Sequence, residues 1–214
     1  MFNDYYYNYL NMESGTEIDN CLLCISPNRD IPLNKKYAYK FIITDYNKKR
    51  VLSASPSISD DILRKICCGL GSNSLNEILQ LPVLHETGYR ISMMYRMIIN
   101  RDKFINYTGY NNAADYISQA RKFVIRDCDS NIISYCKVSD IYCGYGNIVI
   151  WTDSRYRRCG YAKELLIRTI YMCYDEGIEP VYLADSQNIP SIELAKSVGF
   201  EKVQTEIIGC EVLS

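Results

Sequence analysis

The 214-residue sequence has almost no net charge, a single histidine and no long apolar run. Its 24 Lys and Arg against 25 Asp and Glu argue against a nucleic-acid binder, which usually shows a basic excess. No apolar run has the length of a membrane span, and the N-terminus lacks the basic head and apolar stretch of a signal peptide. We therefore expect a globular, cytosolic protein of one large or two small domains, without nucleic acid or membrane as a partner.

The sequence also lacks a complete set of metal ligands. The only C-x-x-C motif joins Cys21 and Cys24, no second such pair follows, and the only histidine is His85. Apolar neighbours predict that these two thiols are buried, and the helix-like context of Cys67 and Cys68 predicts the same for them. We expect free thiols and no metal, and we keep a metal or redox role for Cys21 and Cys24 as a third hypothesis for the function.

What is present is an alternation of strand and helix patterns, which predicts a mixed α/β fold. The first thirty residues are predicted to be an irregular arm or a short helix. Strands are expected at 36–44, 50–54, 89–99, 122–126, 132–138, 147–152 and 181–184, with final strands between 200 and 212. Helices are expected at 60–68, 75–79, 111–119, 162–173 and 190–198.

The most informative segment runs from Trp151 to Ala162, where a strand ends in a basic loop and a helix begins. The first turn of a helix carries unpaired N–H groups and partial positive charge, and both favour an anion. Gly160 lets the backbone approach a ligand closely, and Arg157 and Arg158 add charge. The segment predicts a phosphate site, and a solvated loop without a ligand is the plain alternative.

Two common phosphate motifs are missing. A P-loop needs a Gly-Lys pair, which does not occur in this chain. The dinucleotide fingerprint needs three glycines, and both Gly69-x-Gly71 and Gly144-x-Gly146 fail at the third. The remaining pattern is R-x-x-G-x-A, which Arg157–Ala162 matches.

Together with its downstream context, this loop resembles the GNAT superfamily of acetyl-CoA-dependent N-acetyltransferases. That family carries N-x-x-[SA] on a second helix and then a Gly-Phe pair. This chain has Asn188-Ile189-Pro190-Ser191, then Leu194-Ala195 and Gly199-Phe200. The resemblance covers about residues 105–212.

The resemblance implies a mixed, mostly antiparallel GNAT-type sheet flanked by helices. Residues 105–214 would form the acetyltransferase domain, and residues 1–104 would form a smaller N-terminal α/β region of unassigned role. By analogy alone, that region would shape the acceptor side of the cleft. A homodimer is left open.

The resemblance also implies a set of residues that bind acetyl-CoA. Backbone amides of the loop would bind the diphosphate, the end of the preceding strand would pair with the pantetheine arm, and the second helix would contact the pantetheine or adenosine side. Carried over residue by residue, the set is Ile150, Trp151, Thr152, Arg157, Arg158, Cys159, Gly160, Tyr161, Ala162, Asn188 and Ser191. For Trp151, a packing role of the side chain is expected.

The catalytic residues stay unassigned. Many family members place a Tyr directly after the leucine of the second helix, where this chain has Ala195. Others place a Glu at the start of the central strand, where this chain has Tyr145-Gly146-Asn147. Candidate replacements near predicted strand ends are Asp140, Tyr142, Tyr145 and Asp185, each of which also fits a solvated turn residue or a structural tyrosine.

The leading hypothesis is an N-acetyltransferase that transfers an acetyl group from acetyl-CoA to a small-molecule or peptide amine of unknown identity. Direct attack by a neutral amine is compatible with the missing Tyr and Glu, because positioning can supply much of the rate. The alternative is an acyl-CoA-binding sensor or interaction module on the same fold, without turnover.

Overall fold

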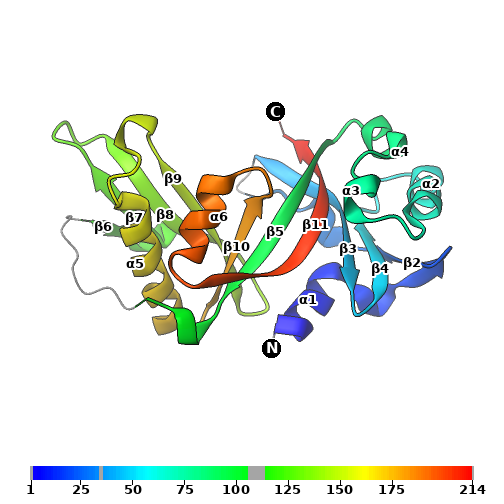
Figure 1. Ribbon diagram of the computed structural model, residues 1–214, viewed down its shortest axis with the longest axis horizontal. Coiled ribbons are helices and arrows are strands. Elements are labelled where there is room, and N and C mark those ends of the chain that lie inside the picture. The colour runs from blue at the N-terminus through cyan, green and yellow to red at the C-terminus, as the bar shows by residue number, and fades with distance from the viewer. Residues whose placement is uncertain (1, 34–35, 106–113, 214) are drawn as a thin grey trace. The chain divides into compact units, whose positions relative to one another are not determined.

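A computed structural model describes residues 2–33, 36–105 and 114–213. The chain is a mixed α/β protein whose sheet is mostly antiparallel and flanked by helices, as the sequence predicts (Figure 1). The described residues up to Tyr95, together with those from Gln204 onward, form one compact unit, and Arg96–Val203 form another. No helix in these ranges is both long and apolar enough to span a membrane.

The first unit is built on strands in the order β1-β2-β4-β3-β11. Strands β3 and β4 form an antiparallel hairpin, β11 pairs antiparallel with β3, and β2 runs parallel to β4. Its elements are α1 (Phe2–Leu10), η1 (Met12–Ser14), β1 (Thr16–Ile18), β2 (Cys21–Ile25), η2 (Pro27–Asp30), β3 (Tyr37–Tyr46), β4 (Lys49–Ala54), α2 (Asp60–Leu70), α3 (Leu75–Ile78), α4 (Pro82–Glu86) and the adjoining parts of β5 (Arg90–Ile99) and β11 (Phe200–Val212).

Helix α2 follows the sequence pattern closely. Ser59 caps its N-terminus by accepting a hydrogen bond from the Ile62 N–H, and the helix ends at Leu70, before Gly71. Leu63, Ile66 and Leu70 recur at helical spacing and are buried in one core with residues of β3 and β4. Burial of this apolar face stabilises the helix against the sheet.

The N-terminal segment has more structure than an irregular arm. The short helix expected as one alternative is present as α1, but Cys21–Ile25 form a strand that the sequence reading missed. Strand β2 pairs with β1 in a local hairpin and with β4, whose Arg50 lies opposite Cys21, and no local pattern encodes the second, distant pairing. Pro82 also begins the short helix α4, although the sequence predicts only a stop near it.

All ten cysteines lie within the described residues and are free thiols, as predicted. Cys21, Cys24 and Cys67 are buried as expected. Cys68 is exposed, which corrects its prediction as a core residue, and its thiol donates to Asp19 at 3.0 Å.

The second unit contains the strand order β10-β9-β8-β7-β6. Helix α5 packs against β7, β8 and β9 (Figure 1). Its elements are the end of β5, η3 (Arg101–Lys103), β6 (Asp115–Ile117), η4 (Ser118–Ala120), β7 (Lys122–Arg126), β8 (Ile132–Tyr142), β9 (Tyr145–Thr152), η5 (Ser154–Tyr156), α5 (Tyr161–Asp175), β10 (Glu179–Asp185), α6 (Ile189–Lys196) and the start of β11.

Most of this unit agrees with the sequence prediction, with two corrections. Residues 111–113 of the helix expected at 111–119 lie outside the described residues, and the rest of it is strand β6 followed by the 3-10 helix η4. Pairing of Asp115 with Val124 of β7 holds this segment extended. The final strands expected after Phe200 are one continuous strand, β11, with a bulge between Gly209 and Cys210.

Candidate functional site

Strands β9 and β10 start as a parallel pair and then separate. Their pairing runs from Tyr145 opposite Glu179 to Ile148 opposite Tyr182. Strand β9 continues for four more residues, to Thr152, and these pair with β8 on the other side. Within the described chain, one backbone edge of residues 149–152 therefore has no partner from β10. We call the point of separation, at Ile148 and Tyr182, the fork.

The loop that follows β9 is organised by Asp153. Its carboxylate accepts from the Arg155 backbone N–H at 2.9 Å and from Arg155 Nε and Nη2, both at 3.1 Å. The hydrogen bonds and charge of Arg155 hold the pKa of Asp153 below its usual range. Arg155 is therefore engaged within the loop, whereas the exposed Arg157 donates a long hydrogen bond of 3.4 Å to the Thr152 carbonyl.

The end of the loop has the backbone geometry of an anion site. Arg158 and Gly160 have φ values of 63° and 83°, in the left-handed region. The first bond of helix α5 runs from the Glu164 N–H to Gly160 O at 3.1 Å. The N–H groups of residues 161–163 precede that bond, so the helix gives them no acceptor. Successive free N–H groups at the start of a 15-residue helix form a concave site for an anion.

Helix α6 contributes the second predicted segment. Exposed Asn188 caps the helix, and its side chain accepts from the Ser191 N–H at 3.3 Å. Ser191 Oγ lies 2.9 Å from the hydroxyl of Tyr182 on β10. The side chains of Asn188 and Ser191 are therefore already used in local hydrogen bonds. Ala195, at the position of the missing Tyr, is fully buried.

Tyr182 is a residue that the sequence reading did not single out. It is 2% exposed, packs against Phe200 with ring centroids 5.4 Å apart, and is the last residue of β10 paired with β9. Burial raises its pKa to about 12. The local signal of this pair is a tyrosine between apolar neighbours in a short strand, followed nine residues later by a serine in the first turn of the next helix.

The candidate replacements for catalytic residues lie at two different ends of the sheet. Tyr145 begins β9, about 23 Å along the strand from Thr152 at about 3.3 Å per residue. Exposed Tyr142 pairs with Tyr145, and Asp140 accepts from Ser139 Oγ at 2.7 Å, so they share that far end. Asp185 ends β10 and accepts from the Gln187 N–H at 2.8 Å, as turn carboxylates do.

Asn147 lies one residue before the fork. Its Oδ1 is buried and has no hydrogen-bond partner among the described residues. Because strand side chains alternate, Asn147 faces the side of the sheet opposite to Ile148. Trp151 is on the same side as Asn147, stacked on Tyr135 at 5.7 Å, and is 41% exposed rather than enclosed.

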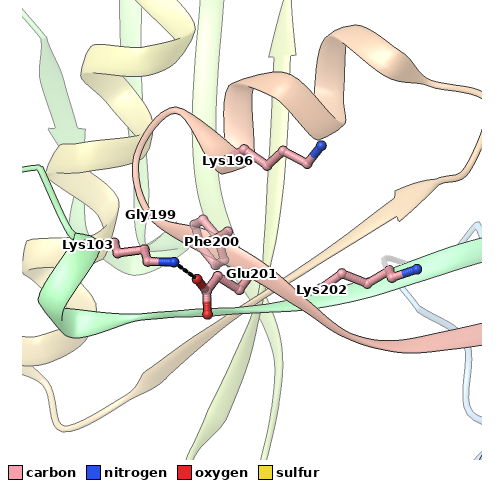
Figure 2. Close-up of a pocket in the computed structure, with 6 residues that line it drawn as sticks. All are labelled: Lys103, Lys196, Gly199, Phe200, Glu201 and Lys202. Carbon is pink, nitrogen blue, oxygen red and sulfur yellow. Dashed lines mark hydrogen bonds and ion pairs between the residues drawn. The ribbon is translucent and has the colours of Figure 1, made fainter.

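A separate depression of about 500 Å³ lies where α6 passes into β11. Figure 2 shows the Lys103 ammonium directed at the Glu201 carboxylate, 2.5 Å away, while Lys196 and Lys202 point away from that pair. Its lining is Lys103, Lys196, Gly199, Phe200, Glu201 and Lys202, and none of these belongs to the predicted coenzyme set. Gly199 is required there, because a Cβ would meet the Lys103 carbonyl oxygen at 2.8 Å.

A family model described as GNAT acetyltransferase matches residues 63–206. The match covers more than half of the sequence, so the chain belongs to the GNAT acetyltransferase family. The matched region begins well before residue 105 and contains the fork, the anion loop and helix α6.

A curated relative is the uncharacterized N-acetyltransferase YdfB of Bacillus subtilis (strain 168), 27% identical over 156 residues. The alignment covers 69% of this chain and 57% of YdfB, so the chain spans little more than half of that relative. A GCN5-related N-acetyltransferase-like protein of Streptococcus suis 89/1591 is 17% identical, with a TM-score of 0.48 over 76% of this chain and 79% of its own. A putative GNAT acetyltransferase of Novosphingobium aromaticivorans is 14% identical, with a TM-score of 0.48 over 58% and 66%.

Proposed function

We propose that the chain is an N-acetyltransferase of the cytosol that moves an acetyl group from acetyl-CoA to an amine of a small molecule or peptide. The observation that carries the proposal is the fork between β9 and β10, because its free strand edge leads directly into the anion loop. Family membership supports acetyl transfer in general. Acetyl-CoA as the donor and an amine as the acceptor are the proposed parts.

The residues present fit a diphosphate joined to an extended amide-bearing arm. Backbone N–H groups of Arg157–Ala162 would bind the diphosphate, since two left-handed residues and a helix start turn such groups to one side. The free edge of Ile150, Trp151 and Thr152 would pair with the pantetheine amides as an added strand does. Asn188 and Ser191 would approach the arm from α6.

Bound acetyl-CoA supplies a thioester, whose carbonyl carbon an amine attacks. An N–H of the free edge of β9 is suited to donate to the oxygen that becomes negative in this attack. The buried, unpartnered Oδ1 of Asn147 is suited to accept from the amine on the opposite side of the sheet. Asn147→Ala should then raise the KM for the amine and leave the affinity for coenzyme A unchanged.

Calorimetric titration of the full chain with acetyl-CoA and with coenzyme A tests the proposal directly. We expect each of the two molecules to bind at one site per chain. Pantetheine, which has the same arm but no diphosphate, should bind much more weakly. If the folded protein binds neither acetyl-CoA nor coenzyme A, the proposal is refuted.

A second function, acyl-CoA binding without turnover, is favoured by one observation. Ala195 is fully buried where many relatives have a Tyr, and Tyr145–Asn147 contain no carboxylate. A screen of amines that measures free thiol release separates the two functions. Release above the hydrolysis background with any amine supports transfer, and binding without release across the screen supports the sensor.

A further inference from the structure

Two hydroxyl groups meet beside the fork. Tyr182 is the last residue of β10 that pairs with β9, and its hydroxyl lies 2.9 Å from Ser191 Oγ in the first turn of α6. Tyr182 is buried, whereas Ser191 is only half-buried. The pair therefore lies at the fork, where β10 stops pairing with β9. Its Ser191 hydroxyl is on a residue that is partly exposed to a ligand.

The Ser191 hydroxyl is the donor that remains in this turn. Among the described residues, the Ser191 N–H donates to Asn188 Oδ1 at 3.3 Å and the Ile189 N–H to Gln187 O at 3.0 Å, and Pro190 has no N–H. Either hydroxyl can be the donor in the pair of Tyr182 and Ser191, and when the phenol donates to Ser191 Oγ the serine proton is free for a ligand. The partial positive charge of a helix N-terminus favours a negative acceptor at this point.

The direction of the free edge of β9 indicates which ligand atom would accept a hydrogen bond from the Ser191 hydroxyl. From Thr152, beside the anion loop, the edge of β9 runs back to Ile148 over about 13 Å at about 3.3 Å per residue. A molecule whose diphosphate lies on the loop and whose arm follows this edge ends near the fork. For coenzyme A that end is the sulfur, so the step rests on the proposed function.

We propose that Ser191, oriented by Tyr182, donates a hydrogen bond to the sulfur of coenzyme A and stabilises it as the leaving thiolate. In the transfer, the amine nitrogen bonds to the carbonyl carbon, the carbon–sulfur bond breaks and its electron pair stays on sulfur. The nitrogen loses its proton to solvent, and the thiolate takes one from solvent. Ser191 keeps its own proton, because an aliphatic hydroxyl is less acidic than a thiol.

Position on the helix supports this role. Ser191 and Ala195 are four residues apart, so they share one face of α6. The Ser191 hydroxyl thus lies on that face one turn before Ala195, and the Tyr182 hydroxyl on β10 holds it in place.

The ionisation of bound coenzyme A tests the inference without an amine. Coenzyme A carrying ¹³C in the methylene next to sulfur is titrated with pH by NMR, free and bound to the full chain. We expect a lower thiol pKa in the complex, and Ser191→Ala should raise it by about one unit, a tenfold change in the thiolate-to-thiol ratio. Tyr182→Phe should raise it by less, and Ser191→Thr should keep it low.

Ser197→Ala is the matched control, since Ser197 lies just after α6 and its hydroxyl donates to the Leu194 carbonyl at 2.8 Å. It should leave the thiol pKa unchanged. If binding to the wild type does not shift the thiol pKa, the inference is overturned but the proposed function is not. The same holds if the thiol pKa of bound coenzyme A is equal in the wild type and in Ser191→Ala. If Ser191→Ala does not fold, an unchanged pKa in Tyr182→Phe overturns it. Failure of the wild type to bind coenzyme A overturns the proposed function.

Discussion

Replacement of Gly160 by glutamate places a carboxylate in the anion loop. Gly160 has a φ of +83°, and apart from its chain neighbours no atom of the described residues lies within 4 Å of the position that a Cβ would take. The new side chain therefore meets open space, and its cost to folding is the left-handed backbone, about 1–2 kcal/mol. For a chain of this size, we expect the Tm to fall by about 2–8 °C.

The cost to binding is larger than the cost to folding. A carboxylate about 5 Å from a diphosphate with two negative charges is repelled by about 2–3 kcal/mol at effective dielectric constants of about 40–80. The Kd for coenzyme A should rise by about 30- to 150-fold. Calorimetric titration at low ionic strength measures this change, and added salt should reduce it.

Gly177→Glu is the matched control at the other end of α5. Gly177 also has a positive φ, +68°, and open space around its Cβ position. It lies about 25 Å from Gly160 along the axis of α5, since 17 residues separate the two glycines at about 1.5 Å per residue. Both variants should lose similar stability, but only Gly160→Glu should lose affinity. A folded Gly160→Glu protein with wild-type affinity would show that the anion binds elsewhere, and equal losses in both variants would make backbone strain the cause.

Three further predictions use the same region and one helix cap. Bound coenzyme A should slow alkylation of the exposed thiol of Cys159, but not that of exposed Cys128, as measured by peptide mass spectrometry; equal protection would contradict the assigned site. Trp151→Ala should change the Kd for coenzyme A less than about threefold while lowering stability by about 0.5–1.5 kcal/mol through the lost stacking on Tyr135. Ser59→Ala should destabilise the protein by about 1 kcal/mol, seen as a lower denaturation midpoint, because it removes the cap of α2.

The fold could be predicted where local patterns and final structure agree. Helix α5 was readable because its buried residues recur at helical spacing and Gly177 ends it with a positive φ. Strand β2 was not readable, because its apolar run is short and one of its two partner strands, β4, is far along the sequence. The segment Asp115–Ile117 looks helical in its local pattern, but pairing with nearby β7 keeps it extended.

The candidate site has two parts, the anion loop and the fork, and only the loop could be predicted from the sequence. The loop from Arg157 to Ala162 carries a motif with fixed spacing, so a linear sequence is enough to find it. The fork depends on where pairing between β9 and β10 stops, which is a property of two strands 30 or more residues apart. The role of Tyr182 follows from that end point and from a contact with α6, so no spacing within the sequence could reveal it.

For the proposed transfer to an amine, the lack of a carboxylate at Tyr145–Asn147 would limit which amines react quickly. An amine attacks only when neutral. At pH 7, a lysine-like amine of pKa about 10.4 is neutral in about one molecule in 2,500, a cost of about 4.6 kcal/mol, whereas an α-amino group of pKa about 7.8 is neutral in about one in seven.

If no side chain takes the amine proton, the transfer rate should follow the neutral fraction of the amine. With a lysine-like acceptor, kcat/KM should rise about tenfold per pH unit from pH 7 to about 10, and with an α-amino acceptor it should level off near pH 8. A rate with a lysine-like amine that already levels off near pH 7 would require a base in the site. Because the described residues near the fork offer Asn147, Tyr182 and Ser191, none of which is a base at that pH, such a result would place the amine at a different part of the sheet.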